Sequence, residues 1–147
     1  MKMETENKTA LTVQTTVKAP AEKVWAFWTE PAHITQWCQA SDDWHAPAAE
    51  NDLREGGRFS TTMAARDGSM SFDFDGVYSA VEPHRFISYT IADGRKVQIA
   101  FTSRNGETDI EETFEAEDTF PLEVQQGGWQ AILDNFSRHV VAKQAPQ

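Results

Sequence analysis

A single carboxylate interrupts a set of apolar residues that recur at strand spacing. Glu112 lies two residues from both Ile110 and Phe114, so a strand through this segment would point all three side chains to one face. A carboxylate that faces a core must be paired or hydrogen-bonded, or its pKa rises. Two interpretations follow. Glu112 is a general base in a desolvated pocket, or the strand end is frayed or bulged and turns Glu112 toward water.

The other metal-binding and nucleophilic side chains are scattered along the chain. A metal site needs about three or four converging ligands, and no CxxC, HxH or HExxH spacing occurs. There is also no GxSxG elbow and no glycine-rich phosphate loop. We therefore expect no metal and no cofactor, and we interpret the single cysteine as a small, partly buried residue. The residues considered are His33, Cys38, His45, His84 and His139.

Composition restricts the classes of partner. The 147 residues include 23 acidic and 13 basic side chains, which gives a net charge of −10. Such a surface repels the phosphates of nucleic acids and anionic lipid headgroups, so neither nucleic acid nor a membrane is an expected partner. One cysteine excludes an intramolecular disulfide, and residues 1–8 lack the apolar stretch of a secretory signal. We expect a cytoplasmic protein.

The length predicts one domain, which begins with a strand and two short helices. We assign residues 1–8 to a disordered N-terminus, residues 9–142 to the domain and residues 143–147 to a loose tail. Residues 11–17 alternate between apolar and polar, which indicates a half-buried strand. Pro20 suits the first turn of a helix with one apolar face, and Pro31 ends that helix and begins a second.

Period-2 patterning returns from about residue 46 to residue 116, where we predict six strands. The turn dipeptides Gly56-Gly57, Asp67-Gly68, Asp93-Gly94 and Asn105-Gly106 separate them. Pro83 fits the connection between the third and fourth of these strands, because proline cannot donate a hydrogen bond within a sheet. The pattern predicts an antiparallel meander with one inward face on each strand.

A long amphipathic helix closes the chain. It begins near Pro121, and its apolar residues recur at helical spacing: Trp129, Ile132, Leu133, Phe136 and Val140. Gly127-Gly128 within it costs roughly 1 kcal/mol per glycine relative to alanine, so either the backbone makes a close approach there or the helix bends, and we favour a bend. The elements together predict an α+β fold, in which a curved antiparallel sheet of about seven strands wraps around the last helix.

Four stretches resemble a known family over nearly the whole chain. They are VKAPAEKVWAFWTEPAHITQW at residues 17–37, DLREGGRF at 52–59, FDGVYSAVEPHRFISYT at 74–90 and GGWQAILDNFSRHV at 127–140. They are similar to the helix-grip, START-like superfamily, in the branch that resembles the activator of the ninety-kilodalton heat-shock-protein ATPase. The resemblance implies a deep, mostly apolar pocket between the sheet and the closing helix. Relatives often carry a second Trp after the position of Trp37, where this chain has Cys38.

Three functions remain open at this point. The first is a module that binds a small hydrophobic or amphipathic molecule in the implied pocket. The second is a cavity enzyme of cyclase or hydrolase type with Glu112 as general base, and the third is a chaperone-interaction module. A homodimer is left open. Trp37 and Trp44 flank the polar stretch QASDD, which we interpret as a rim. The expected ligand-binding residues are Trp37, Trp44, Met63, Phe74, Tyr89, Phe101, Phe114, Trp129 and Leu133.

Overall fold

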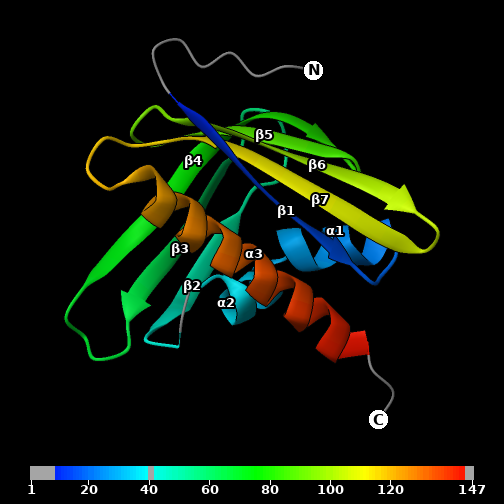
Figure 1. Cartoon of the computed structure of the whole chain (residues 1–147), viewed down its shortest axis with the longest axis horizontal. Helices are drawn as coiled ribbons and strands as arrows, with labels where there is room; N and C mark the ends of the chain where they lie inside the picture. The colour runs from blue at the N-terminus through cyan, green and yellow to red at the C-terminus, as the bar shows by residue number, and fades with distance from the viewer. Residues whose placement is uncertain (1–8, 40–41, 145–147) are drawn as a thin grey trace.

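Seven strands with alternating apolar residues form one antiparallel sheet, in a computed structural model that describes residues 9–39 and 42–144. The sheet order is β1-β7-β6-β5-β4-β3-β2, so only the first strand is out of sequence order (Figure 1). Each turn dipeptide predicted from the sequence falls between two strands. The strands are β1 (Ala10–Val17), β2 (Trp44–Asn51), β3 (Arg58–Ala65), β4 (Ser71–Glu82), β5 (Phe86–Ile91), β6 (Lys96–Arg104) and β7 (Glu107–Glu115).

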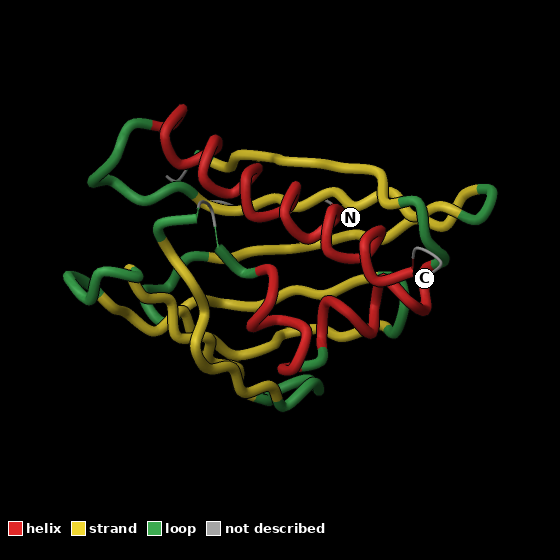
Figure 2. The backbone as a smooth tube through the Cα atoms, turned by 90° about the horizontal axis from the view of Figure 1, so that it is seen from below, coloured by secondary structure: helices red, strands yellow, loops and turns green. Residues whose placement is uncertain are grey.

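Three helices pack against the inner side of this curved sheet (Figure 2). Helices α1 (Ala21–Thr29) and α2 (Pro31–Trp37) follow the first strand, and α3 (Leu122–Gln144) closes the chain. Pro31 occupies the first turn of α2, where its missing N–H is not needed. No described helix is both long enough and apolar enough to cross a membrane.

The sheet register explains which residues form the core. Successive inward residues on β7 pair with inward residues on both neighbours, so Phe114 lies between Leu11 and Val97, and Ile110 lies between Thr15 and Phe101. The apolar side of α3 packs on this inner face of the sheet. Its most deeply buried side chains, together with those of the sheet and α1, include Val13, Val17, Val24, Ile99, Phe114, Leu133, Phe136 and Val140.

The two edge strands, β1 and β2, differ in what occupies their outer edges. On β1, the Gln130 side chain donates to the Gln14 carbonyl and accepts from the Gln14 N–H, and Gln126 donates to the Thr12 carbonyl. On β2, Pro47 lies within the strand, and the pairing with β3 shifts between His45 and Ala48. Proline at this place removes a donor from an edge, where no ladder partner is lost.

The predicted α+β architecture is confirmed: seven strands, two short helices after the first strand and a long final helix. Pro83 lies in the connection between β4 and β5, as predicted. Residues 1–8 and 145–147, assigned to a disordered start and a loose tail, lie outside the described residues. The final helix reaches Gln144 and so includes two residues that we had assigned to the tail.

The burial of α3 predicts the effect of shortening its central side chain. Leu133 is fully buried, so Leu133→Ala should lower the free energy of unfolding by about 2 to 5 kcal/mol. Val141→Ala, on an exposed position of the same helix, is the matched control and should change it little. Urea denaturation measures both. Equal midpoints for the two variants would contradict the placement of Leu133.

The glycine pair in α3 predicts a stabilising change. A Cβ at Gly127 or Gly128 would meet nothing within 4 Å, so the alternative of a close backbone approach is absent. Helix α3 continues through the pair, and the favoured bend stays a prediction. Gly127→Ala should raise the free energy of unfolding by up to about 1 kcal/mol. Gly76→Ala is the contrasting variant and should lower the free energy of unfolding, because its Cβ would lie 2.5 Å from the Thr90 carbonyl oxygen. Thermal unfolding should move the two variants in opposite directions.

Candidate ligand-binding cavity

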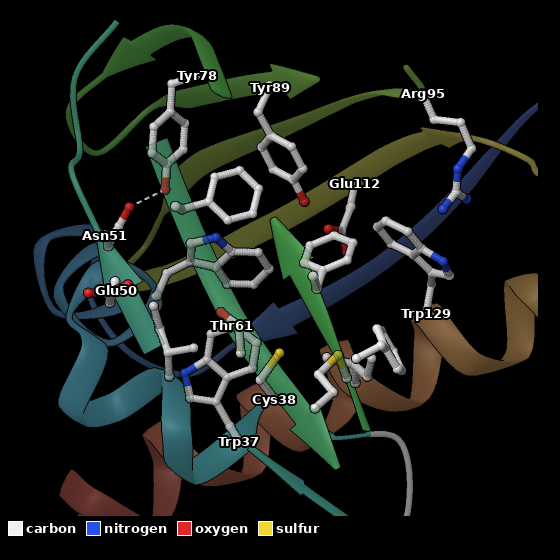
Figure 3. Close-up of a pocket in the computed structure, with 17 residues that line it drawn as sticks. Trp37, Cys38, Glu50, Asn51, Thr61, Tyr78, Tyr89, Arg95, Glu112 and Trp129 are labelled. Atoms are coloured by element: carbon white, nitrogen blue, oxygen red, sulfur yellow. Dashed lines mark hydrogen bonds between the residues drawn. The ribbon is translucent and has the colours of Figure 1, made fainter. Parts of the chain in front are cut away.

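The inner face of the sheet and parts of all three helices line a partly open cavity of about 270 Å³ (Figure 3). This volume is close to the lower end of the range for small-molecule pockets, roughly 300 to 1,000 Å³. Side chains from every strand except β1 and β6 contribute to its wall. The lining residues are Trp28, Ile34, Trp37, Cys38, Glu50, Asn51, Phe59, Thr61, Met63, Phe72, Phe74, Tyr78, Tyr89, Arg95, Glu112, Trp129 and Ile132.

Aromatic rings form much of the wall and fix one another in place. Trp129 stacks on Phe114, with ring centroids 4.0 Å apart and an interplanar angle of 6°. Phe59 meets the ring of Tyr89 edge to face at 4.7 Å. Phe59 fits there because residue 76 is glycine: a Cβ at Gly76 would lie 3.0 Å from the Phe59 ring. The cavity therefore has flat, polarisable walls that suit a planar apolar ligand.

Helix α2 is held in position by polar contacts beside the cavity. The Trp37 indole N–H donates to the Phe27 carbonyl at 3.0 Å. His33 Nδ1 lies 3.2 Å from His139 Nε2 on α3, and the ring of Phe27 stacks on His33 at 3.8 Å. Burial and the neighbouring His33 lower the pKa of His139. These contacts join α1, α2 and α3 on one side of the cavity.

Glu112 points into the cavity from β7, the strand next to the edge strand β1 (Figure 3). It pairs with Val13 on one side and Ile99 on the other, so it stands in an apolar row. Its exposed fraction is only 6%, and no hydrogen-bond partner for its carboxyl occurs among the described residues. Burial raises the pKa of Glu112 from 4.5 to about 8. The carboxyl is therefore mostly protonated at neutral pH, and the alternative of a solvent-facing Glu112 is wrong.

Two further titratable groups face Glu112 in neutral form. The Tyr89 hydroxyl points toward the Glu112 carboxyl (Figure 3). Burial is the main cause that raises the pKa of Tyr89 well above its usual range, and the nearby Glu112 carboxyl raises it further. Burial and Glu112 also raise the pKa of the Cys38 thiol to about 12, so Cys38 is not an activated nucleophile. The interior of the cavity thus carries hydroxyl, thiol and carboxylic acid groups without charge at neutral pH.

Charged and hydrogen-bonded groups lie toward the edges of the cavity. Arg95 Nε lies 2.8 Å from Asp93 Oδ2, and Arg95 also donates to the Glu115 carbonyl. At another edge, the Tyr78 hydroxyl donates to Asn51 Oδ1 at 2.5 Å. Asn51 in turn donates to a carbonyl at the end of α1. These polar groups already have partners within the chain, in contrast to Glu112.

The structure brings together part of the predicted set of site residues. Glu112, Trp37, Met63, Phe74, Tyr89 and Trp129 all line the cavity. Trp44, Phe101, Phe114 and Leu133 do not, and each has a different environment. Trp44 contacts the ring of the partly exposed Phe72. Phe101 packs on Trp25 and Trp28, Phe114 lies behind Trp129, and Leu133 is in the core beneath α3. These four residues support the cavity instead of lining it.

Several lining residues were missed by the sequence reasoning. Phe59 and Tyr78 have inward strand parity, and Trp28 lies on the apolar face of α1, but parity alone does not separate cavity wall from core. Arg95 follows a turn and had no apolar pattern to mark it. Cys38 adjoins the proposed rim at residues 39–43, of which residues 40 and 41 lie outside the described residues. In the described ranges, no group of three or more His, Cys, Asp or Glu side chains is arranged to hold a metal.

A comparison with protein families identifies the class of protein to which this fold and cavity belong. The model for the family described as "Activator of Hsp90 ATPase homolog 1-like protein" matches residues 18–140. The chain therefore belongs to this family, and the resemblance noted in its sequence is confirmed. A search of the curated proteins found no match.

Solved structures support the same assignment. An AHSA1-like protein from Aeromonas hydrophila is 40% identical, with a TM-score of 0.87 over 95% of this chain and 99% of that one. A protein from Cytophaga hutchinsonii is 55% identical, with a TM-score of 0.76 over 96% of this chain and 98% of that one. A protein from Nitrosomonas europaea has a TM-score of 0.80 at 18% identity over 93% of this chain and 97% of that one, which shows a shared fold alone.

The raised pKa of Glu112 predicts that stability falls as the pH rises. The unfolded chain releases this proton near pH 4.5, whereas the folded protein retains it to about pH 8. The protonated Glu112 carboxyl therefore makes its full contribution to the free energy of unfolding below pH 4.5, and this contribution is lost as the pH rises to about 8. Over this range the free energy of unfolding falls by up to about 1.4 kcal/mol per pH unit. Glu112→Gln should flatten this slope.

Denaturation at a series of pH values measures the slope, and carbon-detected NMR of the Glu112 carboxyl measures the pKa directly. Glu111→Gln is the matched control, because Glu111 is the exposed neighbour on the same strand. It should leave the slope of the parent protein unchanged. If the Glu112 carboxyl titrates near its ordinary value, the side chain is solvated and the description of the cavity interior fails.

Proposed function

We propose that the protein binds a small, largely apolar molecule in the cavity between the sheet and the helices. One observation carries the proposal: a cavity of about 270 Å³ is lined by aromatic rings from three strands and three helices. A filled core would leave no such space, since protein interiors pack as densely as organic crystals. An apolar cavity of this size gains free energy when an apolar ligand replaces the water within it.

The environment of Glu112 favours binding over catalysis. A general base needs a group that orients it and a reacting proton within about 3 Å. No described side chain is hydrogen-bonded to the Glu112 carboxyl, and the wall contains no histidine. One observation supports the second candidate, a cavity enzyme of cyclase or hydrolase type. A carboxyl pKa of about 8 lies near the value at which a base is most effective.

A fluorescent apolar dye tests ligand binding. We expect an anilinonaphthalene dye to bind the native protein saturably, with enhanced dye emission and quenched or shifted emission from Trp37 and Trp129, which line the cavity. Trp129→Ala should remove one wall and weaken binding. Trp25→Ala is the control, because Trp25 is buried outside the cavity. A folded protein that shows no saturable binding would contradict the proposed function.

Native mass spectrometry of freshly purified protein complements the titration. A retained small molecule would add a defined mass to that of the chain and allow its identification. Turnover of such a molecule, lost in Glu112→Gln while binding persists, would support the enzyme instead. A decrease of roughly 10²- to 10⁴-fold is typical when a general base is removed.

A further inference from the structure

The polar groups inside the cavity restrict the chemistry of its ligand. Glu112 and Tyr89 enter the cavity from β7 and β5 of the same sheet, with their polar ends directed toward each other (Figure 3). Between them in the sheet lie Val97 and Ile99 of β6, which are apolar and fully buried. Neither the carboxyl nor the hydroxyl has a hydrogen-bond partner among the described residues. Neither is among the described side-chain atoms that are fully buried without a partner, so both face the space of the cavity and are available to a ligand.

Both groups are neutral, and each has a proton to donate. No described cation contacts the Glu112 carboxyl. The nearest one in the wall, Arg95, is engaged by Asp93 and by the Glu115 carbonyl. Ionising Glu112 in this environment would leave a buried carboxylate unpaired, which is why burial raises its pKa to about 8. A protonated carboxylic acid and a phenol are both hydrogen-bond donors.

Two converging donors match one acceptor with two lone pairs, which a carbonyl oxygen provides. A buried protonated carboxylic acid paired with a tyrosine is a known arrangement for holding a ligand oxygen, as in the oxyanion hole of ketosteroid isomerase. The ring of Trp129, with Phe114 stacked behind it, and the rings of Phe59 and Phe74 line the cavity, and Phe74 meets Trp129 edge to face at 6.0 Å. A planar aromatic body therefore complements the walls.

We propose that the ligand is a small neutral aromatic molecule whose carbonyl oxygen accepts hydrogen bonds from both the Tyr89 hydroxyl and the Glu112 carboxyl. This inference rests on the proposed function. A cationic amine is the competing class, because aromatic rings around a carboxylate can also bind a cation. An amine would have to ionise Glu112 and would lie near Arg95, which repels it. The two classes predict opposite effects of pH on affinity.

The test uses three probes with the same aromatic body: acetylnaphthalene, ethylnaphthalene and naphthylmethylamine. Each displaces a fluorescent dye from the full-length protein, and the displacement gives its affinity. We expect the ketone to bind at least about tenfold more tightly than the hydrocarbon, as one net buried hydrogen bond allows. The affinity of the ketone should fall as the pH rises through the pKa of Glu112, and that of the hydrocarbon should change less.

Variants assign the effect to the two donors. Glu112→Gln places an amide donor at the same position, so the ketone preference should persist while its pH dependence disappears. Tyr89→Phe should reduce the preference for the ketone and leave hydrocarbon binding intact. Tyr78→Phe is the matched control, because the Tyr78 hydroxyl also borders the cavity but already donates to Asn51. It should retain the ketone preference of the parent protein.

The outcomes separate this inference from the proposed function. Equal binding of ketone and hydrocarbon would overturn the inference and leave the cavity as an apolar binding site. Tightest binding of the amine, with an affinity that rises with pH through the pKa of Glu112, would overturn it in favour of a cation. If none of the three probes binds the folded parent protein, the proposed function fails and the inference fails with it. The pH series on the parent protein requires no variant, so an unfolded variant does not prevent the test.

Discussion

The packing of α3 across the sheet is the constraint on which the rest of the structure depends. A seven-stranded sheet is about 29 Å wide, because strands lie about 4.8 Å apart, whereas a helix with its side chains is only about 10 to 12 Å across. Leu133, Phe136 and Val140 therefore cover one part of the inner face. The short helices α1 and α2 cover another part. The cavity occupies the space that neither covering fills, so it results from the geometry of one helix on a wide, curved sheet.

Glu112 gives this space its chemical character. An apolar residue at its position would leave a row from Val13 through Ile99 that is apolar throughout. The carboxyl instead lowers the stability of the folded protein at and above neutral pH, by an amount that its raised pKa measures. A group that destabilises the fold without making an internal hydrogen bond is more simply explained by a role toward a ligand than by a role in folding. This reasoning joins the unfavourable burial of Glu112 to the proposed function of the cavity.

The sequence alone predicted the strands and the closing helix, because both follow from local periodicity and from turn residues. It left the inward direction of Glu112 as one of two interpretations, since parity does not exclude a frayed or bulged strand end. It did not distinguish residues that line the cavity from residues that fill the core. Phe101 and Tyr89 both lie on inward strand positions, yet Phe101 packs on two tryptophans of α1 while Tyr89 faces the cavity. That difference depends on where α1, α2 and α3 cross the sheet, and no local pattern contains this information. Arg95 was missed for the same reason, since only the folded chain places its turn at the cavity wall.

The side chains on the outer strands have a consequence for self-association. An open sheet presents unpaired backbone groups at both ends, which can recruit a strand from another molecule. Gln126 and Gln130 of α3 already satisfy three backbone groups of Gln14 and Thr12 on β1, much as a neighbouring strand would. At the other end, Pro47 and the register shift beside it interrupt the ladder of β2. Strand addition at either edge would require the loss of these glutamine contacts or pairing around a proline, so both edges oppose the edge-to-edge stacking that leads to aggregation.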